Sequence, residues 1–388
     1  MKFLKKKTFH LLTVAAILFL AFSSAEACTG LMFTLFPNGD SNNQYTFQAR
    51  TMEFGPDVTG WRLISVPRGY PYASCRQKIC GEGIEGIKWT SLYQYVGMSP
   101  ARPDLPLIDE VTDGMNEKGL ACGGFYHMGY EDYKKNPVST RAIANTDFVS
   151  WVLSNFATVQ ELKDALSQRR VEVTQFTVPS CSGNSTCPQL HFAVTDAGGA
   201  SVVVEFKGGE PIVFNSIGVI TNNPTYDWHT TNLNNYIGLQ ALSRESGIFY
   251  NRSYNKLGNG TGAIGLPGDF TPPSRFVRAM FFLTTSMPSY TSPDEGVARA
   301  FRILNQFDIP VGSIVAPSPA GQGMIQDSTM WTSLSDTKRR RYYFHTQTNR
   351  TVRVIELDKL PKNILSYMDL PAHDVIIDVS KKFMPIVK

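Results

Sequence analysis

The first 27 residues place the strongest constraint on the chain, because they divide into the three parts of a secretory signal. A basic head comes first and contains four lysines: Lys2, Lys5, Lys6 and Lys7. An apolar run from Leu11 to Phe22 follows, and Ala25-Glu26-Ala27 forms an Ala-x-Ala cleavage pattern. This run is shorter than the roughly 20 residues of a membrane-spanning helix. We therefore expect residues 1–27 to be removed and the mature chain to be exported, to the periplasm or out of the cell.

Removal of this segment changes the charge of the chain. The 388 residues have a formal net charge of +4, and the signal contributes +3 of it through four Lys and one Glu. The remaining 361 residues are almost neutral, which does not suggest a nucleic-acid-binding protein. They contain no other apolar segment long enough to span a membrane and no break in composition. We expect residues 28–388 to form a single globular domain.

Cleavage would make Cys28 the N-terminal residue of the mature chain. An α-amine has a pKa of about 8, against about 10.4 for lysine, so part of it is unprotonated near pH 7. Such an amine can accept the proton of its own thiol, which makes an N-terminal cysteine a self-sufficient nucleophile. The alternative is a lipidated Cys28 that anchors a binding protein. Ala25 and Glu26 depart from the residues that usually precede a lipidated cysteine.

The other cysteines suggest short-loop disulfides in an oxidising compartment. Cys75 and Cys80 are close in sequence, as are Cys181 and Cys187, so each pair is a candidate bond. Cys122 lies in a Gly-rich apolar stretch and is expected to be a small buried residue of a strand. No CxxC pair or cluster of histidines suggests a zinc site. We therefore expect neither a metal nor another cofactor.

Hydrophobic periodicity predicts strands first, then helices in two pairs with further strands between the pairs, and strands again at the end. Strands are expected at 28–36, 45–54, 61–67, 88–97, 189–196, 200–207 and 211–220, two strands joined by a turn at 116–119 within 111–127, and further strands within 329–357. Helices are expected at 148–156, 158–167, 275–285 and 293–307. Thr158 and Glu161 form a capping-box pattern at the start of the second helix. This order predicts an α+β fold with helices packed on antiparallel sheets.

Five blocks of sequence carry a resemblance to a known family. They are Cys28-Thr-Gly-Leu-Met-Phe-Thr34, Arg50-Thr-Met-Glu53, the stretch from Asp113 to Phe125, the stretch from Ile220 to His229, and the stretch from Leu266 to Phe276. In this order they resemble the choloylglycine hydrolase family of N-terminal-nucleophile hydrolases, which includes bile salt hydrolases and penicillin V acylases. The resemblance covers nearly all of the mature chain. It implies a four-layer αββα fold, with two antiparallel sheets between helical layers, and hydrolysis of a linear amide.

The resemblance also implies roles for the residues around the nucleophile. Cys28 matches the residue that serves as both nucleophile and base. Arg50 matches the family arginine beside the thiol, and a neighbouring arginine favours the ionised form of a thiol. Glu53 stands where the family usually has an aspartate that contacts the α-amine. A glutamate keeps the charge but is one methylene longer, so an inactive family member is an alternative interpretation.

The remaining matched positions concern the oxyanion that forms when a thiolate attacks an amide. Asn222 matches the asparagine whose side-chain amide helps to form the oxyanion hole, although a turn role before Pro224 is also natural. Tyr126 matches the residue whose main-chain N–H would be the second donor. Arg275 matches the last arginine of the active site. His229 is expected to be structural, because this mechanism needs no histidine.

The implied substrate is a carboxamide between an apolar acyl group and a polar amine. Conjugated bile salts, penicillin V and N-acyl homoserine lactones are candidates. Tyr126 stands where penicillin V acylases tend to have tyrosine and bile salt hydrolases asparagine, which favours the last two. Dimers and tetramers are common in the family, so a homo-oligomer is possible. The rival function from another class is a lipid-anchored periplasmic binding protein.

Overall fold

The structure is a computed structural model, and it describes residues 27–54, 60–75, 80, 83–100, 110–176, 187–286, 292–317 and 323–371. The predicted signal segment lies outside these residues except for Ala27. The predicted boundaries of the mature domain, 28 and 388, therefore stay a prediction at both ends.

The first sheet contains the strand that follows Cys28. Its strand order is β14-β1-β2-β18-β19-β20, and β17 also pairs with β18. These strands are β14 (Val219–Ile220), β1 (Gly30–Leu35), β2 (Tyr45–Phe54), β18 (Met324–Asp336), β19 (Arg341–Thr346), β20 (Arg353–Glu356) and β17 (Ile314–Pro317). The predicted hairpin is confirmed, since β1 pairs with β2 in a register that sets Gly30 opposite Arg50. The start of β1 is therefore adjacent to the arginine predicted to contact the thiol.

The second sheet packs behind the first, and its order is β13-β12-β11-β8-β7-β6-β3-β21. These strands are β13 (Glu210–Asn215), β12 (Ser201–Lys207), β11 (Leu190–Thr195), β8 (Ala121–Tyr126), β7 (Asp113–Asn116), β6 (Tyr95–Pro100), β3 (Trp61–Val66) and β21 (Ser366–Asp369). All of its strand pairs are antiparallel. Small additional pairs are β4 (Pro71–Ala73) with β5 (Lys88–Thr90), and β9 (Ala142–Ala144) with β10 (Glu172–Thr174).

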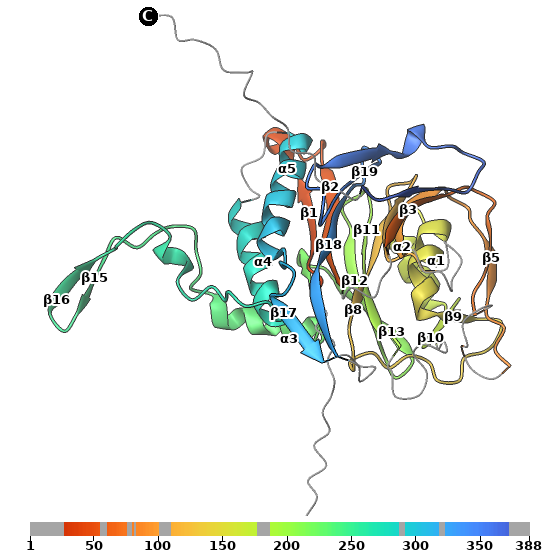
Figure 1. The fold of residues 1–388 in the computed structure, drawn as a ribbon, viewed down its shortest axis with the longest axis horizontal. Coiled ribbons are helices and arrows are strands. Elements are labelled where there is room, and N and C mark those ends of the chain that lie inside the picture. The colour runs from red at the N-terminus through yellow and green to blue at the C-terminus, as the bar shows by residue number, and fades with distance from the viewer. Residues whose placement is uncertain are drawn as a thin grey trace, which may run out of the picture.

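Helices cover the outer face of each sheet, which completes the αββα order of layers (Figure 1). The helices α4 (Pro272–Ser286) and α5 (Pro293–Leu304) pack on the first sheet, and α1 (Phe148–Asn155) packs on the second. The helix α2 (Val159–Ser167) follows α1, and its start is capped as predicted: Thr158 Oγ1 accepts the Glu161 N–H at 3.2 Å. The α+β, αββα prediction is confirmed.

Two strand predictions were wrong because the chain turns inside them. The predicted strand 211–220 is two strands in different sheets, β13 and β14, and the chain crosses between them at Gly218. Gly218 has a φ of 108°, a conformation that favours glycine, and a Cβ there would lie 2.7 Å from Leu283. The predicted strand 88–97 is interrupted after Thr90, where Ser91 Oγ donates to the Tyr93 carbonyl and turns the chain.

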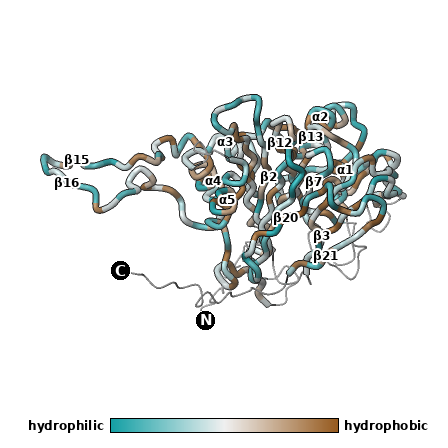
Figure 2. The backbone as a smooth tube through the Cα atoms, turned by 90° about the horizontal axis from the view of Figure 1, so that it is seen from above, coloured by the Kyte–Doolittle hydropathy of each residue, from teal (hydrophilic) through white to brown (hydrophobic). Residues whose placement is uncertain are grey.

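An arm projects away from the sandwich (Figures 1 and 2). It contains the hairpin of β15 (Ser246–Phe249) and β16 (Arg252–Asn255) and follows the short helix α3 (Tyr226–Asn232). Large apolar side chains on it are exposed, including Ile248 and Phe249 at 74% and 70%. Exposed apolar patches of this kind are typical of surfaces that contact another molecule.

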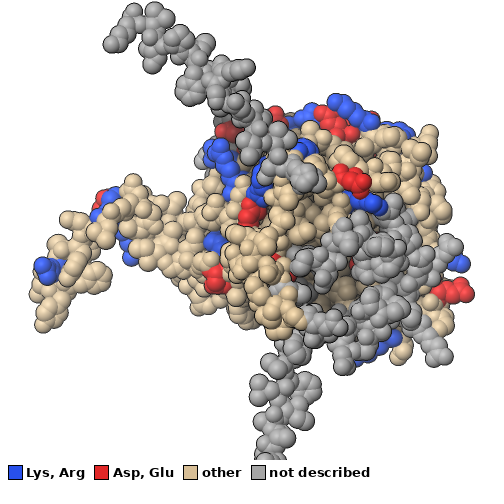
Figure 3. All heavy atoms as spheres, viewed as in Figure 1, with Lys and Arg blue, Asp and Glu red and all other residues tan. Residues whose placement is uncertain are grey.

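The cysteines follow the predictions where they are described. Cys75 and Cys80 form a disulfide, and Cys122 is a free, fully buried residue of β8. Cys187 is disulfide-bonded, while its predicted partner Cys181 lies outside the described residues. None of the helices in the described ranges is long and apolar enough to cross a membrane. Acidic and basic side chains are interspersed on the face in Figure 3.

Candidate active site

Two arginines are among the largest fully buried side chains of the molecule, and both contact Cys28 or its neighbour. Cys28 lies two residues before β1 and is completely buried. Its Sγ accepts a hydrogen bond from Arg50 Nη2 at 3.0 Å, and its backbone N–H donates to Asn222 Oδ1 at 2.9 Å. The structure therefore brings together residues that are 22 and 194 positions apart in the sequence.

Arg50 is held in place by more than the thiol. Its Nη1 donates to the Gly124 carbonyl on β8, and its Nε donates to the Thr51 carbonyl at 3.2 Å. The guanidinium also lies over the ring of Phe125, 4.2 Å from its centroid, which is a cation–π contact. Arg50 thus joins the first sheet to the second at the position of Cys28.

Asn222 is the centre of the polar contacts around Cys28. Its Oδ1 accepts from Cys28 N and from Arg275 Nη2 at 2.7 Å, and its Nδ2 donates to the Tyr126 carbonyl at 2.9 Å. These partners fix the orientation of the amide, because a guanidinium can only donate and a carbonyl can only accept. Arg275 Nη1 also donates to the Cys28 carbonyl and, at 3.0 Å, to Thr29 Oγ1. Burial lowers the pKa of Arg275 to about 10, so it stays charged near neutral pH.

Tyr126 lies at the end of β8, and its backbone N–H points away from β11. His127 N donates to the Gln189 carbonyl at 2.8 Å, so the neighbouring pair of Tyr126 and Leu190 exchanges no ladder hydrogen bonds. The Tyr126 N–H is instead directed to the same side as the Gly124 N–H, which donates to Thr112. The strand on that side is β7, which begins at Asp113 opposite Gly123 and so does not extend alongside Tyr126.

Glu53 is on β2 and is buried in the same region. Its Oε1 accepts from Thr329 Oγ1 at 2.9 Å, while its Oε2 has no hydrogen-bond partner among the described residues. Burial is the main cause that raises the pKa of Glu53, from 4.5 to about 8, against the lowering effect of Arg275. The carboxyl group also interacts electrostatically with the Cys28 thiol.

The ionisation of the thiol differs from the expectation drawn from the arginines. Burial raises the pKa of Cys28 and outweighs Arg50, which lowers it. In the described chain Ala27 is still attached, and it is 3% exposed. The Cys28 nitrogen is then an amide rather than an amine, so the thiol of this form has no base of its own.

An apolar cavity opens beside these residues. It has a volume of about 130 Å³, and its apolar lining includes Met52, Trp61, Val111, Tyr126 and Leu190. Gly124, whose carbonyl accepts from Arg50, also lines it. The cavity therefore borders the groups that contact Cys28. A larger hollow of about 550 Å³ lies on the projecting arm and involves none of these groups.

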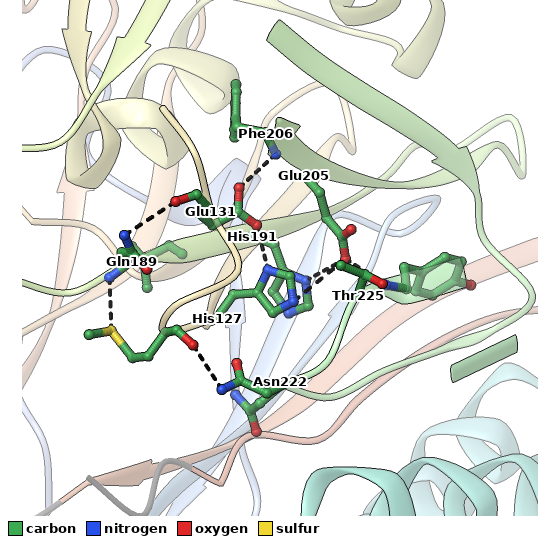
Figure 4. Close-up of polar contacts among 12 residues, drawn as sticks. His127, Glu131, Gln189, His191, Glu205, Phe206, Asn222 and Thr225 are labelled. Atoms are coloured by element: carbon green, nitrogen blue, oxygen red, sulfur yellow. Dashed lines mark hydrogen bonds and ion pairs between the residues drawn. The ribbon is translucent and has the colours of Figure 1, made fainter. Parts of the chain in front are cut away.

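Nothing in the sequence pointed to a second cluster, which lies next to Asn222 (Figure 4). His127, Glu131, His191 and Glu205 are all buried there. His191 and Glu205 come from predicted strands, but no spacing in the sequence indicated that they meet. His229, predicted to be structural, lies beside the cluster: its Nε2 donates to the Asn222 carbonyl at 2.9 Å, and burial lowers its pKa to about 4.

Three members of the cluster, His127, His191 and Glu205, lie close enough together to be considered as metal ligands. Their geometry does not fit a metal ion. The two imidazole rings are stacked, with centroids 4.1 Å apart and planes 11° apart. A metal must lie in the plane of each ring that binds it, and two parallel planes share no such point. Both Nε2 atoms also point at backbone carbonyls, which only accept hydrogen bonds, so each Nε2 carries a hydrogen and has no lone pair to offer a metal.

An αββα sandwich with a buried cysteine beside its first strand is the architecture of the N-terminal-nucleophile hydrolases. Within that class, residues 28–370 match the family model of linear amide C–N hydrolases, the choloylglycine hydrolase family. The chain belongs to this family, as the sequence blocks predicted.

Relatives and solved structures agree with this membership. A bile salt hydrolase/transferase of Clostridium perfringens is 36% identical over 76% of this chain and 84% of its own. A penicillin V acylase of Pectobacterium atrosepticum is 27% identical over 90% of this chain and 86% of its own. The crystal structure of a mutant conjugated bile acid hydrolase from C. perfringens has a TM-score of 0.74 and 30% identity, covering 91% of this chain and 100% of that one.

Proposed function

We propose that the protein is an exported amidase that uses Cys28, freed by signal cleavage, to hydrolyse a linear carboxamide. The observation that carries the proposal is the convergence of Arg50, Asn222 and Arg275 on Cys28. Cys28 is also the residue at which the family match begins and the residue that follows the predicted cleavage site. An amide hydrolase activity follows from the family, and the export and the N-terminal mechanism are our extension of it.

Cleavage supplies the base that the uncleaved chain lacks. The new α-amine accepts the thiol proton, and the thiolate attacks the carbonyl carbon of the substrate. Arg50 stabilises the thiolate through the contact it already makes with Sγ at 3.0 Å. The ammonium then returns the proton to the leaving amine, which departs and leaves an acyl thioester on Cys28. Water hydrolyses this thioester and regenerates the free thiol.

The negative oxygen formed in each attack needs donors that are already in place. An Asn222 Nδ2 hydrogen and the Tyr126 backbone N–H are the proposed pair. Asn222 is fixed by Arg275 and by the Tyr126 carbonyl, so it loses little freedom during the reaction. One such donor contributes about 3–4 kcal/mol to transition-state stabilisation.

The apolar cavity is the proposed place for the acyl group of the substrate. A volume of about 130 Å³ is close to the roughly 150 Å³ that holds a single benzene ring. We propose a compact apolar acyl group, as in penicillin V or a short N-acyl homoserine lactone, over the fused rings of a bile acid. The named bile salt relatives make conjugated bile salts the second candidate.

A release assay across the three substrate classes tests the proposal. The mature protein is incubated with penicillin V, with glycine- and taurine-conjugated bile salts, and with N-acyl homoserine lactones, and the freed amine is quantified. Turnover by the wild type, with Cys28→Ala folded but inactive, is the expected result. Activity retained by Cys28→Ala would contradict the mechanism.

The mass of the mature N-terminus separates the rival function. A free N-terminal cysteine at residue 28 supports the enzyme, whereas a diacylglyceryl adduct indicates a lipid-anchored binding protein. If the wild type is inactive on every class and Glu53→Asp gains activity, the chain is a family member that lost catalysis through this substitution.

A further inference from the structure

The segment that carries Asn222 has no regular secondary structure, although its first two residues are buried and the next two are partly buried. It spans residues 221–224, between β14 and α3. Buried backbone carbonyls need hydrogen-bond donors, and here imidazoles supply them. The Thr221 carbonyl accepts from His191 Nε2 at 3.0 Å, the Asn222 carbonyl from His229 Nε2 at 2.9 Å, and the Pro224 carbonyl from His127 Nε2 at 3.1 Å. Three histidines, one on β11, one on α3 and one directly after β8, therefore hold one short segment.

Two of these histidines are themselves held from behind by carboxyl groups (Figure 4). His127 Nδ1 lies 2.5 Å from Glu131 Oε1, and His191 Nδ1 lies 3.2 Å from Glu205 Oε1. The carboxyl groups are anchored by backbone donors, since Glu131 Oε2 accepts from Phe206 N at 2.6 Å and Glu205 Oε1 accepts from the N–H of residue 226 at 2.8 Å. One chain of contacts thus runs from Phe206 on β12 through Glu131 and His127 to the segment 221–224. The other runs from Glu205 on β12 through His191 to the same segment.

The protons in this network can be assigned from the partners. A carbonyl only accepts, so Nε2 of each ring must carry a hydrogen. The ring is neutral if the carboxyl group then donates to Nδ1. Burial lowers the pKa of His127 and of His191. It raises the pKa of Glu205 above its usual value, and it raises the pKa of Glu131 to about 9. Stacked rings 4.1 Å apart would also repel each other if both were charged. Near pH 7 Glu131 therefore keeps its proton and faces a neutral His127, and burial shifts His191 and Glu205 toward their uncharged forms.

The same contacts connect the segment to the second oxyanion donor. His127 directly follows Tyr126, whose carbonyl accepts from Asn222 Nδ2 at 2.9 Å. His127 then reaches across to the Pro224 carbonyl, two residues beyond Asn222. A shift of the imidazole would move both donors that face the oxyanion. Displacements of about 1 Å at such a site can cost 100-fold in rate.

We propose that His127 and His191, each held by a buried glutamic acid, are positioning residues that fix Asn222 for the amide hydrolysis proposed above. Neither is a base in the reaction. Their function is to pair the carbonyls of the segment 221–224 and so to set the place of the Asn222 amide. The inference rests on the proposed function for its kinetic consequences, but its structural consequences are independent of it.

The test compares variants that remove the donor while keeping a flat ring. In the mature protein, His127→Phe and His191→Phe are expected to lower kcat about 10- to 100-fold with KM changed by less than about twofold. Rates are normalised to the concentration of reactive Cys28 thiol, so that a smaller folded fraction does not count as a slower enzyme. His345→Phe is the matched control, since His345 is a buried histidine on β19, separated from β14 by three strands. It should leave kcat unchanged.

Glu131 offers the conservative variant that a general loss of packing would not rescue. A glutamine amide can accept from Phe206 N and donate to His127 Nδ1, as the protonated acid does. Glu131→Gln should therefore keep kcat within about threefold of wild type, while Glu131→Leu should fall as far as His127→Phe. Equal losses in the two Glu131 variants, or unchanged kcat in both ring variants, would overturn the inference.

A structural readout keeps the inference testable whatever the substrate. Nitrogen NMR of the histidine-labelled protein should find His127 and His191 neutral with the hydrogen on Nε2. Crystal structures of the two ring variants should show Asn222 Nδ2 displaced from the Tyr126 carbonyl. Charged rings, or an unmoved Asn222, would refute the inference. An inactive wild type with these structural results intact would refute only the proposed function.

Discussion

Glu53 provides a measurable test of the electrostatics around Cys28. Its carboxyl group is buried, with a pKa raised from 4.5 to about 8 and one oxygen unpaired in the described part of the chain. When the folded state holds a proton more tightly than the unfolded state, rising pH favours unfolding. The uncleaved chain should therefore lose stability from pH 4.5 upward until about pH 8. At about 1.4 kcal/mol per pH unit, the full loss is about 5 kcal/mol.

Replacement of Glu53 by glutamine isolates this effect from other acids. Burial also raises the pKa of Glu131 to about 9 and of Asp327 to about 6, so the wild-type profile alone mixes several groups. Urea unfolding of the full chain is measured at pH 5, 6, 7 and 8 for the wild type and for Glu53→Gln. The variant should gain about 3–4 kcal/mol relative to the wild type between pH 5 and 8. Glu245→Gln, on the exposed arm, is the matched control and should show no such trend.

The reasoning fails if the wild type and Glu53→Gln have parallel stability profiles over this range. The same measurement on a chain that begins at Cys28 adds a second comparison. An α-ammonium near the carboxyl group favours its ionised form, so the pKa of Glu53 should fall. The difference in unfolding free energy between the wild type and Glu53→Gln should then change less with pH than it does in the full chain. A profile identical to that of the full chain would show that the amine and Glu53 do not interact.

Three further predictions concern the packing of the two sheets, the arm and the disulfide. Asp113 Oδ2 accepts from Ser333 Oγ at 2.8 Å and from Tyr342 OH at 2.6 Å, which joins the two sheets. Asp113→Ala should cost about 3 kcal/mol in urea unfolding, and a loss below about 1 kcal/mol would contradict a linking role. Phe249→Asp, on the arm, should reduce the mass seen by light scattering if the arm joins copies of the chain, and an unchanged oligomer would exclude that surface. Cys75→Ser opens a disulfide loop of short span and should lower stability by about 2 kcal/mol under oxidising conditions, with no difference once the wild type is reduced.

Local sequence patterns predicted those elements whose structure depends on their own residues. The hairpin of β1 and β2 follows from alternation on both sides of a polar turn, and its pairing is as expected. The cap of α2 needs only Thr158 and Glu161, which are three residues apart. The strand 211–220 was mistaken because Gly218 sends the chain to the other sheet, and periodicity does not reveal which sheet a strand joins.

The site required information that no local pattern contains. Arg275 and Cys28 are 247 positions apart, and only the resemblance to a family indicated that they meet. The cluster of His127, Glu131, His191 and Glu205 had no such guide. Its histidines are scattered in the sequence, and their burial and stacking arise from the packing of β8, β11 and β12. A buried polar network of this kind is a tertiary feature, since each member is tolerable only when the others satisfy it.

Under the proposed mechanism, the contacts around Cys28 leave the uncleaved chain inactive although both arginines are already in place. Arg50 already contacts Sγ, and Arg275 already holds the Cys28 carbonyl, so the positive charges are in place before cleavage. Burial nevertheless keeps the thiol protonated, because it outweighs those charges. Cleavage between Ala27 and Cys28 would add an amine at the nitrogen that now donates to Asn222 Oδ1, and an ammonium can keep that hydrogen bond. Activation would then require a change at a single atom, with the surrounding groups left where they are. A structure of the chain beginning at Cys28 should accordingly show Arg50, Asn222 and Arg275 unmoved, and rearrangement of any of them would mean that cleavage also builds the site.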